Sequence, residues 1–422
     1  MRFLLAASGT YGDVAPFVAL GMELQKRGHE VLMAVNPFFI PMVQEKGLPF
    51  RAVETWREAD AILNRPDLRR LYIGRLATPW LVRELMIPGL GRRYLELKAL
   101  IAEWRPDLVL THLFCLDTNW AADDNHVPWA SALLSPVTVL SADQLGYFHG
   151  LLNLTGAPLW LRKYGKWRLR LLARWLVDSP VNRLRKELGL PRQKGALLER
   201  IHDGKVTLGL WSAHYRPPAS DDPPRLRICG FPWFEWNWKE GQAESLRQFL
   251  DAGEPPIVFA LGTAHHRVVE NFFETAAEAC AELGRRGLFL TGNEREPPLS
   301  KYGPLIRSYE RVPSSEVLPR ASLAVYHGGI GTTAQAMRAG CPSLVVPFVH
   351  DQFDNGVRVT RLGLGERVGH WRLTLKKLAA IIDRVINDRA VKARCEVMKD
   401  KLKLEDGGVE AARILEHCLS GE

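Results

Sequence analysis

The chain has 422 residues, long enough for two domains with separate cores, and 46% hydrophobic with 24% charged residues excludes a disordered or fibrous chain. The net charge of +9 suits anionic ligands or surfaces, and charge alone is too weak a signal to indicate nucleic-acid binding. Six scattered cysteines without C-x-x-C spacing argue against a disulfide framework and a zinc site. The apolar run at the start of the sequence is too short for a signal peptide, and no apolar stretch is long enough to span a membrane. We therefore expect a cytoplasmic protein.

The first half of the chain alternates predicted strands and helices. Residues 2–7 form an apolar strand, residues 8–12 (SGTYG) form a turn, and the apolar positions of 14–27 share one helical face. Strand–helix alternation with apolar strands predicts a parallel sheet covered by helices. Further strands are expected at 29–35, 108–111, 129–134 and 206–211.

A second strand–helix series follows a Pro- and Trp-rich stretch at 216–238. The sequence therefore predicts an α/β protein of two Rossmann-like domains. We expect the boundaries to be 1–220 for the first domain, 221–240 for a linker, 241–405 for the second domain and 406–422 for a helix that packs back on the first. Strands of the second series are expected at 257–261, 287–290, 305–309, 323–326 and 343–346.

The segment 324–355 (AVYHGGIGTTAQAMRAGCPSLVVPFVHDQFDN) carries most of the chemistry. A strand runs into HGGIGTT at 327–333, where glycines allow close approach of a ligand and a following helix offers its N-terminal N–H groups to a phosphate. Asp351 and Gln352 follow the next strand and offer donors and acceptors that suit a sugar. The alternatives are a plain tight turn and a helix cap.

Three motifs in this order resemble the donor signature of family 1 glycosyltransferases with the GT-B fold: HGG-x-GTT, A-G-x-P and P-x-x-x-DQ-x-x-N. GTYGDVAPF near the start also fits, so the resemblance covers most of the chain. Within that family the chain is similar to bacterial rhamnolipid-type rhamnosyltransferases and to antibiotic- or sterol-directed enzymes. The resemblance implies that a sugar moves with inversion from a UDP- or dTDP-sugar to a hydroxyl of a hydrophobic acceptor.

The resemblance assigns donor contacts residue by residue. His327, Gly331 and Thr332 match the diphosphate site, and Asp351 with Gln352 matches the pair that binds sugar hydroxyls. The chain departs from the family at Arg311, where an aromatic usually lies under the base, and at Gln335, where many members have a ribose-binding Glu. The complete expected donor site is Gly12, Thr263, Arg311, Val312, His327, Gly329, Gly331, Thr332, Thr333, Gln335, Asp351 and Gln352.

Asp13 matches the family position of the catalytic base, and His112 matches the residue that orients it, with the two residue types exchanged. Either side chain of such a pair can accept the proton. Asp117 is a further candidate. The alternatives are that Asp13 only caps the helix at 14–27 and that His112 is a core histidine.

No D-x-D motif follows a strand, so we expect neither a metal nor a resident cofactor, with the nucleotide-sugar as co-substrate. The segment 160–176 (WLRKYGKWRLRLLARWL) alternates aromatic with basic residues. It is expected to form a wall of the acceptor pocket, and the alternative is a helix on an anionic membrane surface. Twelve of the 13 tryptophans precede residue 240, which favours an apolar acceptor site in the first domain.

Two other functions compete with glycosyl transfer: a nucleotide-sugar epimerase of the same fold and a catalytically silent sugar-nucleotide binder. A nicotinamide oxidoreductase is disfavoured because no G-x-G-x-x-G with a trailing acidic residue occurs.

Overall fold

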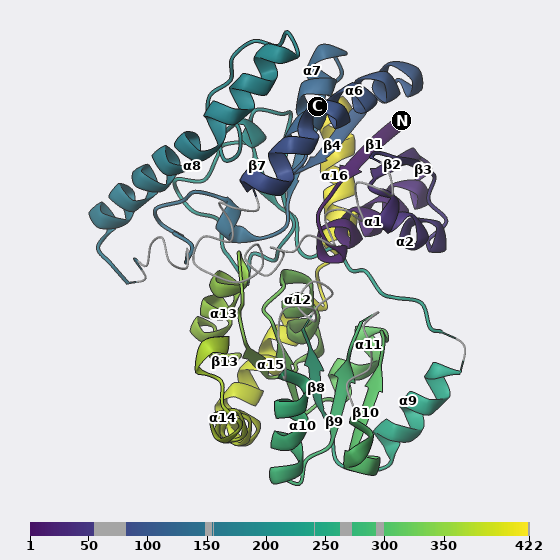
Figure 1. The fold of residues 1–422 in the computed structure, drawn as a ribbon, viewed down its shortest axis with the longest axis vertical. Helices are drawn as coiled ribbons and strands as arrows, with labels where there is room; N and C mark the ends of the chain where they lie inside the picture. The colour runs from purple at the N-terminus through teal and green to yellow at the C-terminus, as the bar shows by residue number, and fades with distance from the viewer. Residues whose placement is uncertain are drawn as a thin grey trace. The chain divides into compact units, whose positions relative to one another are not determined.

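A computed structural model of the chain describes residues 1–54, 82–147, 154, 156–239, 241–261, 272–292 and 299–420. The described residues divide into two compact α/β units (Figure 1). Residues up to Phe234 and from Asp406 onward form the first unit, and Glu235–Glu405 forms the second. The linker expected at 221–240 starts too early, because residues 226–228 form a strand of the first sheet.

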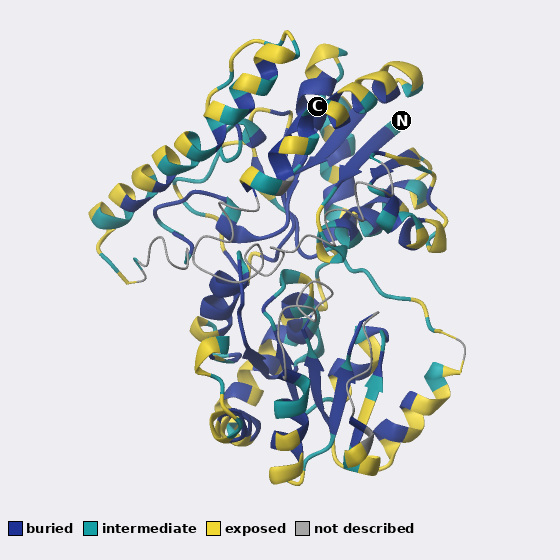
Figure 2. Ribbon diagram, in the orientation of Figure 1, coloured by how far each residue is buried: buried dark blue, intermediate teal, exposed yellow. Residues whose placement is uncertain are grey.

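The first unit is built on a seven-stranded sheet in which every described pair is parallel. The strand order β3-β2-β1-β4-β5-β6-β7 reverses between β1 and β4, the point where open α/β sheets hold ligands beyond their carboxyl ends. Figure 2 shows the central strands as buried. The strands are β1 Arg2–Ala7, β2 Glu30–Val35, β3 Phe50–Ala52, β4 Leu108–His112, β5 Trp129–Leu133, β6 Thr207–Gly209 and β7 Leu226–Ile228.

Helices surround this sheet, and α1 and α7 pack on its strands through buried apolar side chains. The first begins at Tyr11, three residues earlier than expected. In the part of the chain that the structure describes, no helix combines the length and apolarity needed to cross a bilayer. The helices are α1 Tyr11–Lys26, α2 Ile40–Glu45, α6 Ile87–Trp104, α7 Leu116–Asp124, α8 Leu159–Glu187 and α16 Gly407–Ser420.

The second unit holds a parallel sheet of order β10-β9-β8-β11-β12-β13, which reverses between β8 and β11. Its strands are β8 Ile257–Ala260, β9 Gly287–Leu290, β10 Ile306–Tyr309, β11 Leu323–Tyr326, β12 Ser343–Val345 and β13 Gly365–Arg367. Its helices are α9 Gln242–Asp251, α10 Phe272–Glu282, α11 Ser314–Val317, α12 Ile330–Ala339, α13 Gln352–Arg361, α14 Leu375–Asn387 and α15 Arg389–Leu402.

The C-terminal helix α16 belongs to the first unit and packs against α1. Its side chain Glu416 accepts hydrogen bonds from Arg27 Nε at 2.9 Å and lies 2.7 Å from His29 Nε2. At its start, the Gly407 N–H donates to the Phe231 carbonyl at 3.1 Å, and a Cβ at Gly407 would overlap the backbone of Gly230. The last helix is thus tied to the first unit at both ends.

We predict that Glu416→Gln lowers the free energy of unfolding by about 1 kcal/mol at neutral pH. The hydrogen bond from Arg27 lowers the pKa of Glu416 from 4.5 to about 2. The carboxylate therefore stabilises the folded state fully above pH 4.5 and loses this effect as the pH falls toward 2. Urea unfolding across this range should show the variant and the parent converging. Glu410→Gln, on the same helix and paired among the described residues with nearby Arg413, is the control. An equal loss of unfolding free energy in both variants would contradict the role of Glu416 in holding the last helix to the first unit.

Candidate active site

The turn between β1 and α1 places Asp13 at the switch point of the first sheet. Gly9 has a φ of +133°, and a Cβ there would overlap the Asp13 carboxylate, so the turn requires glycine. Asp13 Oδ2 accepts hydrogen bonds from the Thr10 N–H at 2.6 Å and the Thr10 hydroxyl at 2.8 Å. Asp13 is therefore the N3 residue of a capping box, and Thr10, not Asp13, is the N-cap residue.

The other carboxylate oxygen of Asp13 faces His112, the last residue of β4. Asp13 Oδ1 lies 3.7 Å from His112 Nε2, within ion-pair range and slightly long for a hydrogen bond. The Asp13 side chain is 23% exposed and that of His112 only 4%. Burial lowers the pKa of His112, with the Asp13 charge opposing it. Asp13 thus faces solvent, and a buried imidazole that favours its neutral form lies behind it.

The further candidate Asp117 takes part in a different interaction. It is fully buried at the start of α7 and accepts a hydrogen bond from Arg93 Nε at 2.7 Å. Arg93 also donates to Glu54 at 2.8 Å. Burial raises the pKa of Asp117, and the Arg93 charge opposes this. This buried ion pair ties α6 to α7, and a catalytic role for Asp117 stays a prediction.

The glycine turn of the second unit connects β11 to α12. Gly328 has a φ of +95°, and a Cβ there would lie 2.8 Å from Val345 Cγ1 and 2.9 Å from the Gln352 carbonyl oxygen. The Asn355 amide donates to the Gly328 carbonyl at 2.8 Å and to Asp351 Oδ2 at 3.0 Å. One side chain therefore joins the glycine turn to the loop that carries Asp351.

The first turn of α12 has the features of an anion site. A Cβ on exposed Gly331 would meet no atom within 4 Å, and Thr332 is half-buried beside it. His327 Nδ1 lies 3.5 Å from the Ala260 carbonyl, which orients the ring at the end of β11. The prediction that Thr333 offers its hydroxyl to the donor is wrong. That side chain is fully buried, and its hydroxyl donates to the Gly329 carbonyl at 3.0 Å.

Asp351 and Gln352 begin α13, at the carboxyl end of β12. The side-chain oxygen of buried Gln352 accepts hydrogen bonds from the backbone N–H groups of Phe348 and Val349 at 2.9 and 3.1 Å. This oxygen shapes the loop, while half-buried Asp351 lies nearer the surface. Their role in binding a sugar stays a prediction.

The segment after β10 forms a third part of the site. The Arg311 guanidinium stacks over the Trp236 ring, 4.3 Å from its centroid, and contacts Glu310. Val312 beside it is buried. The sequence analysis did not identify Trp236 as a partner of Arg311.

Glu235 is another residue that sequence reasoning missed. Its carboxylate accepts hydrogen bonds from the Gln335 side chain at 3.1 Å and from the Ser314 N–H at 2.9 Å. Burial raises the pKa of Glu235, and the hydrogen bonds from the backbone of Ser315 and Ser314 oppose this. A carboxylate is therefore present beside Gln335, where the family pattern usually has one.

Two predicted donor residues are not among the described residues of the second unit. Thr263 lies outside the described residues, and Gly12 lies in the first unit, exposed in the first turn of α1. Within the described ranges, no group of three His, Cys, Asp or Glu side chains is arranged to hold a metal ion.

We predict that Gly328→Ala lowers Tm by about 5 °C, because a residue with a Cβ is strained at this φ and overlaps Val345. Gly331→Ala is the matched control, since its Cβ points into open space and alanine favours the helix. Thermal unfolding of both variants tests the assignment. An unchanged Tm for Gly328→Ala would show that the turn tolerates a side chain.

Comparison with known protein families finds a match in each of the two units. Residues 3–87 match the glycosyltransferase family 28 N-terminal domain, and residues 287–417 match the erythromycin biosynthesis protein CIII-like C-terminal domain. The chain is 30% identical to an O-mycaminosyltylonolide 6-deoxyallosyltransferase of Streptomyces fradiae, over 99% of this chain and 97% of that one. It is 27% identical to a sterol 3-beta-glucosyltransferase of Arabidopsis thaliana, over 98% of this chain and 65% of that one.

A solved structure of the glycosyltransferase VinC in complex with DTDP is similar in fold, with a TM-score of 0.69 and 20% identity. The likeness covers all of both chains. Two parallel-sheet Rossmann-like units with this donor motif, together with the relative from Streptomyces, identify the chain as a glycosyltransferase of family 1 with the GT-B fold.

Proposed function

We propose that the enzyme transfers a hexose or deoxyhexose from a UDP- or dTDP-sugar to a hydroxyl of a hydrophobic acceptor, with inversion at C1 and without a metal ion. The observation that carries this proposal is the Asp13–His112 pair. It combines an accessible carboxylate with a buried histidine behind it, at the switch point of the first sheet. A general base in this position is what an acceptor hydroxyl needs.

In the proposed step, the acceptor hydroxyl gives its proton to Asp13 as its oxygen attacks C1 of the sugar. The bond between C1 and the diphosphate oxygen breaks, and the nucleoside diphosphate leaves from the opposite face. His112 is a positioning residue, because it is buried and reaches a substrate only through Asp13. A general base contributes about 10²–10⁴-fold to such a step.

The proposed donor site lies at the carboxyl ends of β11 and β12. The diphosphate charge is met by the N-terminus of α12, to which Gly329, Gly331 and Thr332 belong, and by His327. Asp351 accepts hydrogen bonds from sugar hydroxyls, with Gln352 holding its loop. DTDP in the VinC structure supports a thymidine or uridine diphosphate donor.

The proposed acceptor is an apolar hydroxylated compound. The two relatives are named for O-mycaminosyltylonolide and for a sterol, which supports this class. The epimerase alternative requires carboxylates close to the donor sugar. In the described part of the second unit, Asp351 is the carboxylate that the family pattern places beside the donor sugar, and an epimerase would need more than one.

Asp13→Asn tests the proposed base. The variant keeps a side-chain oxygen to accept from Thr10, so the cap survives while the base is lost. We expect acceptor-dependent release of nucleoside diphosphate from UDP-glucose or dTDP-rhamnose, in EDTA, to fall about 10²–10⁴-fold in kcat. A panel of hydrophobic alcohols serves as acceptors.

Asp107→Asn is the matched control, because Asp107 precedes the opposite end of β4 and its carboxylate accepts a hydrogen bond from the Arg2 N–H, far from Asp13 in the sheet. Donor isomerised without acceptor would establish the epimerase, and donor bound but left intact would establish the silent binder. Activity that EDTA abolishes and magnesium restores would contradict metal-independent transfer.

Arg311→Ala tests the nucleotide end of the site. We propose that the guanidinium, held over the Trp236 ring, stacks under the base in place of the family's aromatic residue. Its removal should raise KM for the donor about tenfold with little change in kcat. Arg307→Ala, on β10 and bonded to backbone carbonyls, is the control. An unchanged donor KM in Arg311→Ala would contradict this role.

A further inference from the structure

The long helix α8 presents a row of large apolar side chains to solvent. It lies at the periphery of the first unit, and exposed residues recur along it (Figures 1 and 2). The sequence analysis expected a wall of the acceptor pocket here, with a membrane-surface helix as the alternative, and in the structure these side chains are exposed. Their exposed fractions are 70% for Trp160, 49% for Tyr164, 52% for Trp167, 41% for Leu171 and 75% for Trp175.

These five residues, the aromatic stripe, follow helical spacing. Their steps of four, three, four and four residues keep them on one face over about 22 Å of helix. The opposite face is buried through Gly165, Leu169 and Val177. Apolar side chains this large are normally packed away in a water-soluble helix, so a continuous exposed row indicates a surface that binds something.

Cations border the aromatic stripe on both sides. At 100° per residue, Lys163 and Arg170 lie on one side of it and Arg168 on the other. Arg170 pairs with Glu199, whereas neither Lys163 nor Arg168 has a carboxylate partner among the described residues. Arg168 instead donates to the Tyr164 hydroxyl at 3.2 Å and lies over its ring. The two charges are available to an anionic partner.

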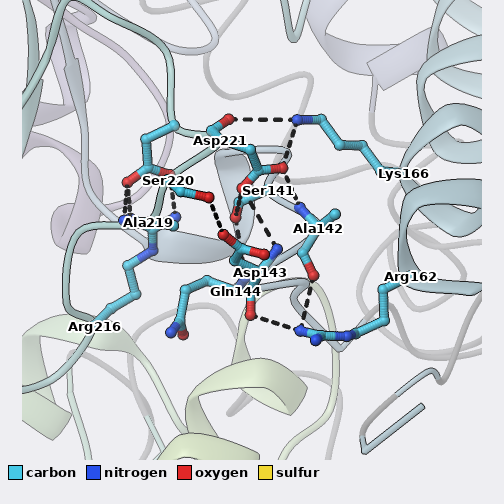
Figure 3. Close-up of polar contacts among 11 residues, drawn as sticks. Ser141, Ala142, Asp143, Gln144, Arg162, Lys166, Arg216, Ala219, Ser220 and Asp221 are labelled. Carbon is cyan, nitrogen blue, oxygen red and sulfur yellow. Dashed lines mark hydrogen bonds and ion pairs between the residues drawn. The ribbon is translucent and has the colours of Figure 1, made fainter. Parts of the chain in front are cut away.

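The inner side of α8 is fixed to the unit by a polar network (Figure 3). Arg162 donates to the carbonyls of Ala142 and Asp143 at 2.9 and 2.8 Å, and Lys166 donates to Asp221 Oδ2 at 2.8 Å. Burial alone would raise the pKa of Asp221, yet Lys166 and the Ser141 hydroxyl hold it well below its usual range. The first turns of α8 are therefore held in one orientation, with the aromatic stripe outward.

We propose that the aromatic stripe docks the enzyme on an anionic lipid bilayer. Indole rings prefer the boundary between headgroups and acyl chains, and flanking lysine and arginine side chains pair with anionic headgroups. The net charge of +9 adds attraction to such a surface. This inference does not depend on the proposed transfer reaction, and it would bring the enzyme to apolar acceptors dissolved in the bilayer.

Co-sedimentation with vesicles tests the proposal. The intact protein is mixed with vesicles of phosphatidylcholine and phosphatidylglycerol in equal amounts, and with vesicles of phosphatidylcholine alone. We expect binding to the anionic vesicles that falls more than about tenfold in the combined variant Trp160→Ser, Trp167→Ser and Trp175→Ser. Its matched control replaces exposed apolar residues elsewhere: Leu95→Ser, Val397→Ser and Leu404→Ser.

A charge variant separates the two contributions. Lys163→Glu with Arg168→Glu should weaken binding to anionic vesicles, whereas Lys376→Glu with Lys377→Glu, which changes the net charge equally on α14, should do so much less. Equal binding by the stripe variant and its control would overturn the proposal. The proposal would also be overturned if the parent protein did not bind vesicles but formed a dimer, and the stripe variant were monomeric. The partner of the stripe would then be a second copy of the chain. Thermal unfolding confirms that the variants fold, and nucleotide release with a dispersed acceptor reports the transfer reaction separately.

Discussion

Asp13 performs two tasks with its two carboxylate oxygens, and the first unit is arranged around them. One oxygen closes the first turn of α1 through Thr10, and the other faces His112 at the end of β4. A capping interaction of this kind contributes about 0.5–2 kcal/mol, so the side chain is held in one orientation before any substrate binds. Gly9 is required because any larger residue would overlap that carboxylate. The reversal of strand order between β1 and β4 brings the two groups together.

The second unit repeats this principle with different chemistry. Its strand order also reverses beside β11, and a glycine turn leads into a helix whose first N–H groups attract an anion. Asn355 links this turn to the loop of Asp351 by two hydrogen bonds. The backbone positions of the proposed phosphate and sugar subsites therefore depend on each other. In the proposed function the first unit supplies the base and the second supplies the donor contacts, which is the division of work that two-substrate transfer requires.

Local patterns in the sequence predicted much of this arrangement. Most of the apolar strands, the turn after residue 7 and the HGGIGTT turn were predicted because each depends on neighbouring residues. The short strands β3, β7 and β13 escaped prediction because each contains a charged residue and none shows the apolar run that marked the equally short β6 and β12. The alternative that Asp13 caps the helix placed the N-cap three residues too late, because the helix starts earlier than its apolar positions suggest and Thr10 is its N-cap.

Contacts between distant residues could not be predicted in the same way. Arg93 pairs with Asp117 and Glu54 across long stretches of chain, and Trp236 meets Arg311 only in the folded unit. Hydroxyl and amide groups were also misleading, because their type does not reveal their partner. Thr333 bonds to its own helix, and Gln352 bonds to the loop before it.

A double-mutant cycle on kcat tests most directly whether Asp13 and His112 act as one unit. The rates of acceptor-dependent nucleotide release are compared for the parent, Asp13→Asn, His112→Gln and the double variant. If His112 acts only through Asp13, the double variant is slower than Asp13→Asn by less than about twofold. If the two losses multiply, His112 contributes independently of Asp13, and the account of a positioned single base is wrong.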